Sequence, residues 1–385
     1  MKLDPYRNKQ KISAARPHFP DEDLDAIQSD IRKILKSGRL ILGEFTSSFE
    51  EEFRRYTSTD YSVAVSSCTA ALQIALRFYR IQQREVIVPT NNFPSVVGAV
   101  LSEGGVPVLA DMDPNTFCVD TEDLLSRFTP LTAGVIVVHI AGLIYPDIDY
   151  LRSICEQRGL FLIEDASHAH GANLQGRKAG SLAETACFSF YPTKIMTTGT
   201  GGMITTQNED LAKYARSVRH HGLSSSGDLV VDLGNDWCLS EIHAVLGRCQ
   251  LKHLDEFIAH RNHLVSLYRK GLESASWLSI PVYPAGNLHA YYKLPVLIDT
   301  DLDRNRFRQL LRDDFLIENG GIYDPPCHLQ PAIQEKLGCT EGMFPKAEAV
   351  LRRQLCLPIH SGLSSEEVDR VVEAMFAVAE RCRMP

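Results

Sequence analysis

The chain has 385 residues, 44% of them hydrophobic and 23% charged, an ordinary globular composition with enough length for two domains. Its net charge of −8 argues against nucleic-acid and anionic-membrane partners, since both bind basic surfaces. No apolar run approaches the roughly 20 residues that span a bilayer, and the first residues lack the apolar core of a signal peptide. We therefore expect a cytoplasmic protein.

The ten cysteines lie between Cys68 and Cys382 and include no Cys-x-x-Cys pair. This pattern is typical of small buried hydrophobic residues in a reducing compartment, and it favours neither disulfides nor a metal site.

The N-terminal segment changes character near residue 20. Residues 1–20 contain Pro5, Pro17 and Pro20, which interrupt any helix, so we expect an irregular arm. Ser48-Phe49-Glu50-Glu51 matches a capping box and predicts a helix that begins at Ser48, with Phe49, Phe53 and Tyr56 on one face.

Short runs rich in β-branched residues predict strands between residues 63 and 205. They are residues 63–65, 86–88, 106–109, 135–138, 161–163, 186–190 and 203–205. Helical stretches separate several of them, at residues 70–79, 121–127 and 148–158. Short apolar strands that alternate with helices predict an α/β fold, with a mostly parallel sheet covered by helices and ligands beyond the carboxyl ends of its strands.

The alternation fades after about Leu223. Residues 241–261 predict one long helix that bridges to a second domain. Helices at residues 303–313 and 365–381 and a strand at 291–298 predict a smaller α+β domain. We therefore divide the chain into the arm at 1–20, a large domain at 21–258 and a small C-terminal domain at 259–385.

Lys194 and Asp165 are the main candidate catalytic residues. Asp165 ends the run Phe161-Leu162-Ile163-Glu164, and Lys194 follows 29 residues later in a turn rich in Ser, Thr and Gly. A pyridoxal phosphate enzyme needs this pair, because the lysine amine forms the Schiff base and the carboxylate keeps the ring nitrogen protonated.

A strand, a turn of small residues and a helix start predict a phosphate site at Ser67, Cys68, Thr69 and Ala70. Free backbone N–H groups and the positive end of the helix dipole attract an anion there, and the Thr69 hydroxyl adds a donor. The alternative is that Ser67 or Thr69 only caps the helix. Ser189 offers a second hydroxyl to the same phosphate.

Two further side chains fall at predicted strand ends. Phe93 follows the strand at 86–88 and is a candidate to stack on the cofactor ring, with a core position as the alternative. His168 lies beside Asp165 and is a candidate partner of the cofactor's phenolic oxygen, while His170 braces the loop. No further ligands at suitable spacing indicate zinc.

Taken in order, these segments resemble the sugar aminotransferases of the DegT/DnrJ/EryC1/StrS family, a branch of the fold-type I pyridoxal phosphate enzymes. The resemblance covers nearly the whole chain. Its most specific segments are Glu164-Asp165-Ala166 and Ser189-Phe190-Tyr191-Pro192-Thr193-Lys194; others are Ser66-Ser67-Cys68-Thr69-Ala70-Ala71-Leu72, Ser240-Glu241-Ile242-His243-Ala244 and His328-Leu329-Gln330-Pro331.

The resemblance implies roles for these residues. Lys194 would hold pyridoxal 5′-phosphate, Asp165 would pair with its ring nitrogen, and Thr69, Ala70 and Ser189 would hold its phosphate. The large domain would bind this cofactor. The reaction would move an amino group from glutamate or glutamine to a keto group of a nucleotide-linked sugar. Family members are generally homodimers with shared active sites, so we expect a homodimer.

The chain departs from the family pattern at several positions. Cys68 replaces a usual Gly, His168 a frequent Gln and Ile195 a common Asn. Asp236 replaces an Asn that commonly reaches the phosphate in the partner subunit's site, and Cys238 replaces Arg or Lys. Either Asn235 substitutes for that Asn or the contact is lost.

These departures leave alternatives open. The acceptor is a nucleotide keto-sugar or a keto-cyclitol such as a keto-inositol, and a non-catalytic regulatory or partner subunit with the same fold is a third reading. Sugar dehydratases of this fold usually have His at the lysine position, so Lys194 argues against dehydration. Candidate substrate contacts are Lys293, Tyr323, His328 and the turn His220-His221-Gly222.

Overall fold

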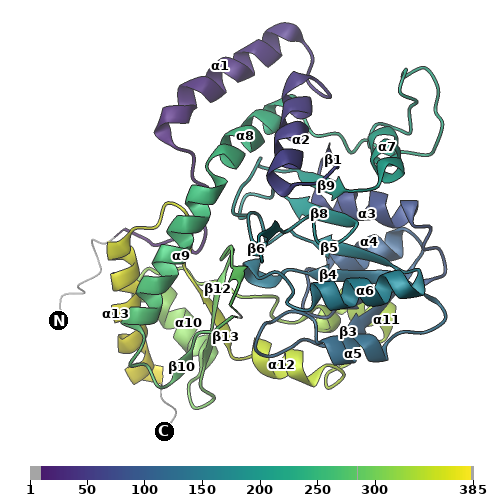
Figure 1. Ribbon diagram of the computed structural model, residues 1–385. Helices are drawn as coiled ribbons and strands as arrows, with labels where there is room; N and C mark the ends of the chain where they lie inside the picture. The colour runs from purple at the N-terminus through teal and green to yellow at the C-terminus, as the bar shows by residue number, and fades with distance from the viewer. Residues whose placement is uncertain (1–9, 284, 383–385) are drawn as a thin grey trace.

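The computed structural model describes residues 10–283 and 285–382, and the part of the arm at 1–9, with Pro5, lies outside them. A seven-stranded sheet occupies the centre of the larger part of the molecule (Figure 1). Its strands are β1 (Tyr61–Val65), β2 (Glu85–Pro89), β3 (Val106–Ala110), β4 (Thr132–Val138), β5 (Phe161–Asp165), β8 (Thr185–Ser189) and β9 (Gly202–Thr206).

The spatial order of the strands is β1-β9-β8-β5-β4-β2-β3. Pairing is parallel from β3 through β2, β4 and β5 to β8, whereas β9 is antiparallel to both β8 and β1. Every residue of β4 is buried, as expected for a parallel strand covered on both faces. The prediction of a mostly parallel sheet is confirmed.

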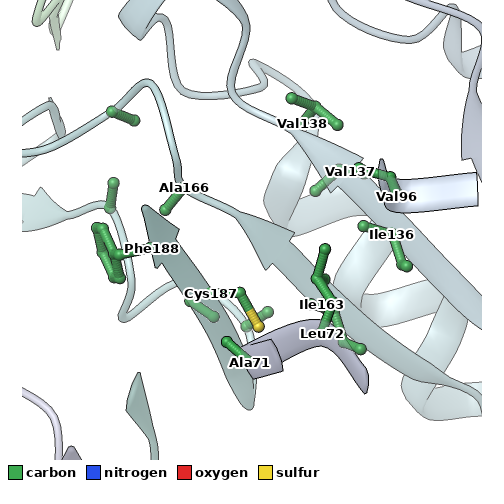
Figure 2. Close-up of a cluster of buried hydrophobic side chains, with 14 of the residues drawn as sticks. Ala71, Leu72, Val96, Ile136, Val137, Val138, Ile163, Ala166, Cys187 and Phe188 are labelled. Carbon is green, nitrogen blue, oxygen red and sulfur yellow. The ribbon is translucent and has the colours of Figure 1, made fainter. Parts of the chain in front are cut away.

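Helices cover this sheet on both sides. They are α2 (Glu44–Thr57), α3 (Cys68–Phe78), α4 (Ser95–Ser102), α5 (Thr121–Ser126), α6 (Ile148–Arg158) and α7 (Glu209–Val218), with α1 (Asp21–Ser37) extending across the top of Figure 1. Figure 2 shows Ala71 and Leu72 of α3 beside Cys187 of β8 and Ile163 of β5. This apolar contact holds the start of α3 at the edge of the sheet where β1 and β5 end.

The helix α2 begins four residues earlier than the capping box predicts. Gly43 is its N-cap, and the buried carboxylate of Glu241 accepts hydrogen bonds from the amides of Gly43, Phe45 and Thr46, each at 2.9 Å. The prediction of a helix start at Ser48 is wrong, because a carboxylate distant in sequence satisfies the free amides of the first turn.

The predicted helix at 241–261 is two helices, α8 (Glu241–Lys252) and α9 (Leu254–Gly271). His253 separates them with φ −102° and ψ 3°, outside helical geometry. Its Nε2 atom contacts Asp23 of α1 at 2.5 Å, so a tertiary contact holds the break in place.

Most of the remaining elements lie at the lower left and along the bottom of Figure 1. They are β10 (Leu278–Ser279), β12 (Leu294–Ile298) and β13 (Gln354–Leu357), which form an antiparallel sheet, together with α10 (Arg304–Asp313), α11 (Pro331–Leu337), α12 (Pro345–Leu351) and α13 (Ser365–Cys382). Two-residue strands β6 (Asn173–Leu174), β7 (Arg177–Lys178) and β11 (Asn287–Leu288) form a third sheet, and two 3₁₀ turns are η1 (Ile140–Gly142) and η2 (Cys327–Leu329).

Buried apolar side chains form two clusters. One surrounds the large sheet and includes side chains of α11 and α12, and the other lies between α9, α10, α13 and the sheet of β12. The predicted boundary at residue 258 falls inside α9, and the division into domains stays a prediction. In the described part of the chain, no helix combines the length and apolar character needed to cross a membrane.

Candidate active site

A cavity of about 520 Å³ lies where β1 and β5 end. Eight of the ten predicted site residues line it: Ser67, Cys68, Thr69, Phe93, Asp165, His168, Ser189 and Lys194. The other two, Ala70 and Asn235, do not. Ala70 is buried in α3, and Asn235 is exposed on the loop between α7 and α8, which projects at the upper right of Figure 1.

The start of α3 supplies one wall of the cavity. Ser67 is the N-cap, and its Oγ accepts a hydrogen bond from the Ala70 amide at 3.1 Å. The capping alternative therefore applies to Ser67, which takes up the Ala70 amide. The first amides of a helix have no partner within it, so those of Cys68 and Thr69 are the donors left for an anion.

Lys194 lies on a loop whose conformation is stabilised by hydrogen bonds of a threonine within the loop. Thr197 Oγ1 donates to the Phe190 carbonyl at 2.9 Å and accepts from the Gly199 amide at 2.9 Å. Gly199 has φ 84°, a conformation that glycine adopts without steric cost. The Lys194 ammonium lies 4.6 Å from the centre of the Tyr292 ring, and within the described residues it has no ion-pair partner.

Asp165 ends β5 between the neighbouring strands β4 and β8. Only 6% of the residue is exposed. Its Oδ1 accepts a hydrogen bond from the Ser167 amide at 3.0 Å, and among the described residues this carboxylate has no other hydrogen bond and no ion pair. The carboxylate is thus oriented by one backbone donor while its second oxygen remains free to accept another.

Cys68 fills space that a glycine would leave open beside this carboxylate. Its Sγ accepts a hydrogen bond from the Ser167 hydroxyl at 3.1 Å. Burial and the nearby Asp165 raise the pKa of the thiol far above its ordinary value, so the thiol stays neutral. The substitution therefore changes the shape of the cavity without adding a charge.

His168 is a neutral hydrogen-bonding group. Burial, followed by the charge of Lys194, lowers its pKa well below the ordinary range. Nδ1 accepts from the Ala141 amide at 3.3 Å, which places the proton on Nε2, and Nε2 lies 3.0 Å from the Tyr323 hydroxyl. Nε2 therefore donates to the Tyr323 hydroxyl, which keeps its own proton available for another acceptor.

Of the candidate substrate contacts, Lys293 and Tyr323 line the cavity. His328 does not, because it is fully buried between Thr90, at 2.7 Å from Nδ1, and Glu348, at 3.1 Å from Nε2. His220 and His221 also lie outside the lining residues. A role for these three histidines in substrate binding within this chain is not supported.

Several residues of the cavity were not predicted from sequence. Ser167, Thr193 and Tyr292 line it, and the Thr193 and Tyr292 hydroxyls are 3.1 Å apart. Burial raises the pKa of Tyr292, but Lys194 and Lys293 outweigh this and leave it below the ordinary value. In the sequence, only its position next to Lys293 marks Tyr292 as a candidate. No motif includes it, because it reaches the site from a segment about 100 residues beyond Lys194.

These groups fit pyridoxal phosphate, the cofactor that the resemblance implies. Lys194 supplies an ammonium with no ion-pair partner in the described structure, and Asp165 a carboxylate oxygen without a donor. Thr69 and Ser189 line the same cavity, and with the first amides of α3 they supply the kind of hydrogen-bond donors that a phosphate requires. An amine, a carboxylate and donors suited to a phosphate, all lining one cavity, match the three attachments that this cofactor needs.

A model of the DegT/DnrJ/EryC1/StrS aminotransferase family matches residues 21–376. The chain belongs to this family. It is accordingly a pyridoxal phosphate-dependent aminotransferase of fold type I, which confirms the resemblance, the enzyme class and the cofactor.

Similar proteins match over nearly their whole length. The dTDP-3-amino-3,4,6-trideoxy-alpha-D-glucose transaminase of Micromonospora megalomicea subsp. nigra is 32% identical over 92% of this chain and 94% of its own. The GDP-perosamine synthase of Caulobacter vibrioides is 32% identical over 96% and 98%. The PLP form of Spr1654 from Streptococcus pneumoniae has a TM-score of 0.88 at 26% identity, covering 95% of this chain and 99% of that one.

Proposed function

We propose that this aminotransferase moves an amino group from glutamate or glutamine to a keto group of a nucleotide-linked sugar. The observation that carries the proposal is the placement of Lys194 and Asp165 in one cavity with the start of α3. The names of the similar transaminase and of the perosamine synthase support a nucleotide-linked sugar as acceptor.

Each residue has a distinct task in this proposal. Pyridoxal phosphate, when bound, supplies an aromatic ring that accepts the electron pair left on the substrate carbon. Asp165 holds the positive charge of the ring nitrogen, and Ser189 and Thr69 bind the phosphate. Phe93, which is 59% exposed at the cavity rim, covers the ring face.

Lys194 Nζ would take up the proton that leaves the substrate carbon and return it at the end of the transfer. It is the one amine in the cavity without an ion pair or hydrogen bond among the described residues, so its lone pair is not committed once it is deprotonated. His168 lies within hydrogen-bond distance of the Tyr323 hydroxyl, and in this proposal Tyr323 would in turn donate its own proton to the phenolic oxygen of the cofactor.

The proposal includes a homodimer, in the cytoplasm, with each site completed by the partner. Asn235 and Asp236 are exposed and do not line the cavity of their own chain. We propose that Asn235 reaches the cofactor phosphate of the partner subunit's site, since the negative charge of Asp236 disfavours that contact.

The test has two stages. Purified protein is first loaded with pyridoxal phosphate, and its absorption band is compared with that of Lys194→Ala; we expect the band of the lysine-bound cofactor only in the unsubstituted protein. Glutamate and glutamine are then paired with a panel of nucleotide keto-sugars and keto-cyclitols.

The outcomes separate the alternatives. Turnover of a keto-sugar supports the proposal. Turnover of a keto-cyclitol alone would show that the acceptor is a cyclitol and not a nucleotide-linked sugar. Cofactor uptake with no turnover on any member of the panel favours the non-catalytic reading, and a protein that takes up no cofactor contradicts the whole assignment.

A further inference from the structure

Lys293 is a half-buried cation without a counter-ion. It precedes β12, and its Nζ donates to the carbonyl of Gly321. Within the described chain no carboxylate pairs with it. Partial burial of an ammonium without a paired charge costs folding free energy. The position of Lys293 therefore points to a role in binding and not in stability.

The same lysine lies between two cavities. Lys293, Tyr292 and Thr193 line the active-site cavity and also an adjoining cavity of about 200 Å³. The remaining lining residues of the smaller cavity are Ala14, Ala15, Gly320, Cys356, Leu357 and Ile359.

The chemistry of the smaller cavity favours a small anion. Its polar side chains are an ammonium, two hydroxyls and the Cys356 thiol, whose pKa burial raises to about 11 and which is therefore neutral. No lining residue is acidic. Its volume is below the roughly 300 Å³ at which typical ligand pockets begin, so it suits a fragment such as a carboxylate and not a nucleotide.

The Tyr292 ring links this cation to Lys194. The ring centre is 4.6 Å from the Lys194 nitrogen and 5.7 Å from that of Lys293. Both amines therefore lie near the same aromatic ring. This arrangement suits a substrate whose carboxylate is close to its amine or keto carbon.

We propose that Lys293, with the Thr193 and Tyr292 hydroxyls, forms a carboxylate subsite beside Lys194. The subsite rests on the proposed function and sharpens it, because it binds a carboxylate of the amino-acid donor or of an acidic sugar acceptor. The ammonium neutralises the carboxylate. The two hydroxyls are hydrogen-bonded to each other at 3.1 Å, so one of them has its proton left to donate to a carboxylate oxygen.

The test uses the holoenzyme with Lys293→Met, Lys293→Arg and, as a control, Lys270→Met on the exposed side of α9. Cofactor absorption is recorded first, and equal bands show that each variant is folded and loaded. Absence of the band from the unsubstituted protein would contradict the proposed function and is thereby separated from failure of the subsite.

Binding is then measured by calorimetry with glutarate, a dicarboxylate that has no amine to react. We expect Lys293→Met to weaken it by about tenfold to a hundredfold, Lys293→Arg to recover part of the loss and Lys270→Met to change nothing. Added salt should weaken binding to the unsubstituted protein more than to Lys293→Met.

A second pair of probes distinguishes the two sources of the carboxylate. UDP-glucuronate and UDP-glucose differ in that group alone. A loss confined to glutarate assigns the subsite to the donor, and a loss confined to UDP-glucuronate assigns it to an acidic acceptor. Unchanged binding of both acids in Lys293→Met overturns the subsite.

Discussion

Lys194 and Asp165 carry opposite charges in one cavity and yet form no ion pair within the described structure. The loop that carries Lys194 is held by the hydrogen bond from Thr197 to the Phe190 carbonyl, and the Lys194 ammonium lies against the Tyr292 ring. The Ser167 amide orients the Asp165 carboxylate. The separation leaves both groups available to a cofactor placed between them, because neither is neutralised by the other.

Asp165→Ala tests the electronic role of the carboxylate. Without it the ring nitrogen loses its proton, so we expect the variant to bind some pyridoxal phosphate but to lose at least about a hundredfold in turnover. The measurement is cofactor absorbance together with steady-state transamination. Asp301→Ala, an exposed aspartate outside the cavity, is the control, and full activity in Asp165→Ala would remove the residue from its assigned role.

At the scale of elements, the start of α2 depends on α8. The buried Glu241 carboxylate accepts hydrogen bonds from three amides and the Thr46 hydroxyl, and no cation accompanies it in the described structure. A Cβ on Gly43 would lie 2.5 Å from Glu241 Oε2, so any larger residue at position 43 would force the Glu241 carboxylate to move.

Glu241→Ala should therefore destabilise the fold. Removing the carboxylate leaves several buried donors unpaired, at about 1–3 kcal/mol each, so we expect a loss of about 3 kcal/mol or more in the free energy of unfolding. Urea denaturation followed by circular dichroism measures this. Glu373→Ala, on the exposed face of α13, should change the midpoint little, and equal effects of the two substitutions would refute the contribution of Glu241.

At the scale of the whole molecule, the projecting loop between α7 and α8 presents apolar side chains to solvent. Leu229, Val230 and Val231 are 62–64% exposed and Leu233 is 80% exposed. A run of exposed apolar residues marks an interaction surface, and the exposed Asn235 follows it directly. Both features agree with the proposed contact to a partner subunit.

Leu233→Asp tests that contact. We expect the unsubstituted protein to be a dimer and the variant to dissociate at a concentration about tenfold higher, because burial of one leucine is lost and a charge enters the interface. Light scattering after gel filtration, over a range of concentrations, gives the mass. Val282→Asp is a control at an equally exposed position, and a monomeric unsubstituted protein would contradict the dimer.

Much of the fold followed from local patterns. The strands of the large sheet and the helices at 70–79, 121–127 and 148–158 were predicted because their apolar spacing reflects burial on one or both faces. The helix start at Ser48 and the unbroken helix at 241–261 were wrong. Both errors arise where a distant side chain, Glu241 or Asp23, determines the backbone.

By itself the sequence determined the family and pointed to Asp165 and Lys194, because both residues occupy specific motifs that follow predicted strands. Tertiary structure alone decided which groups surround them. Tyr292, Lys293 and Tyr323 enter the cavity from the far end of the chain, whereas His328 turns into the core to meet Thr90 and Glu348. The physical reason is that a motif reflects the local conformation that its own residues must adopt. The charge and the volume of the cavity depend instead on contacts between segments that are far apart in the sequence.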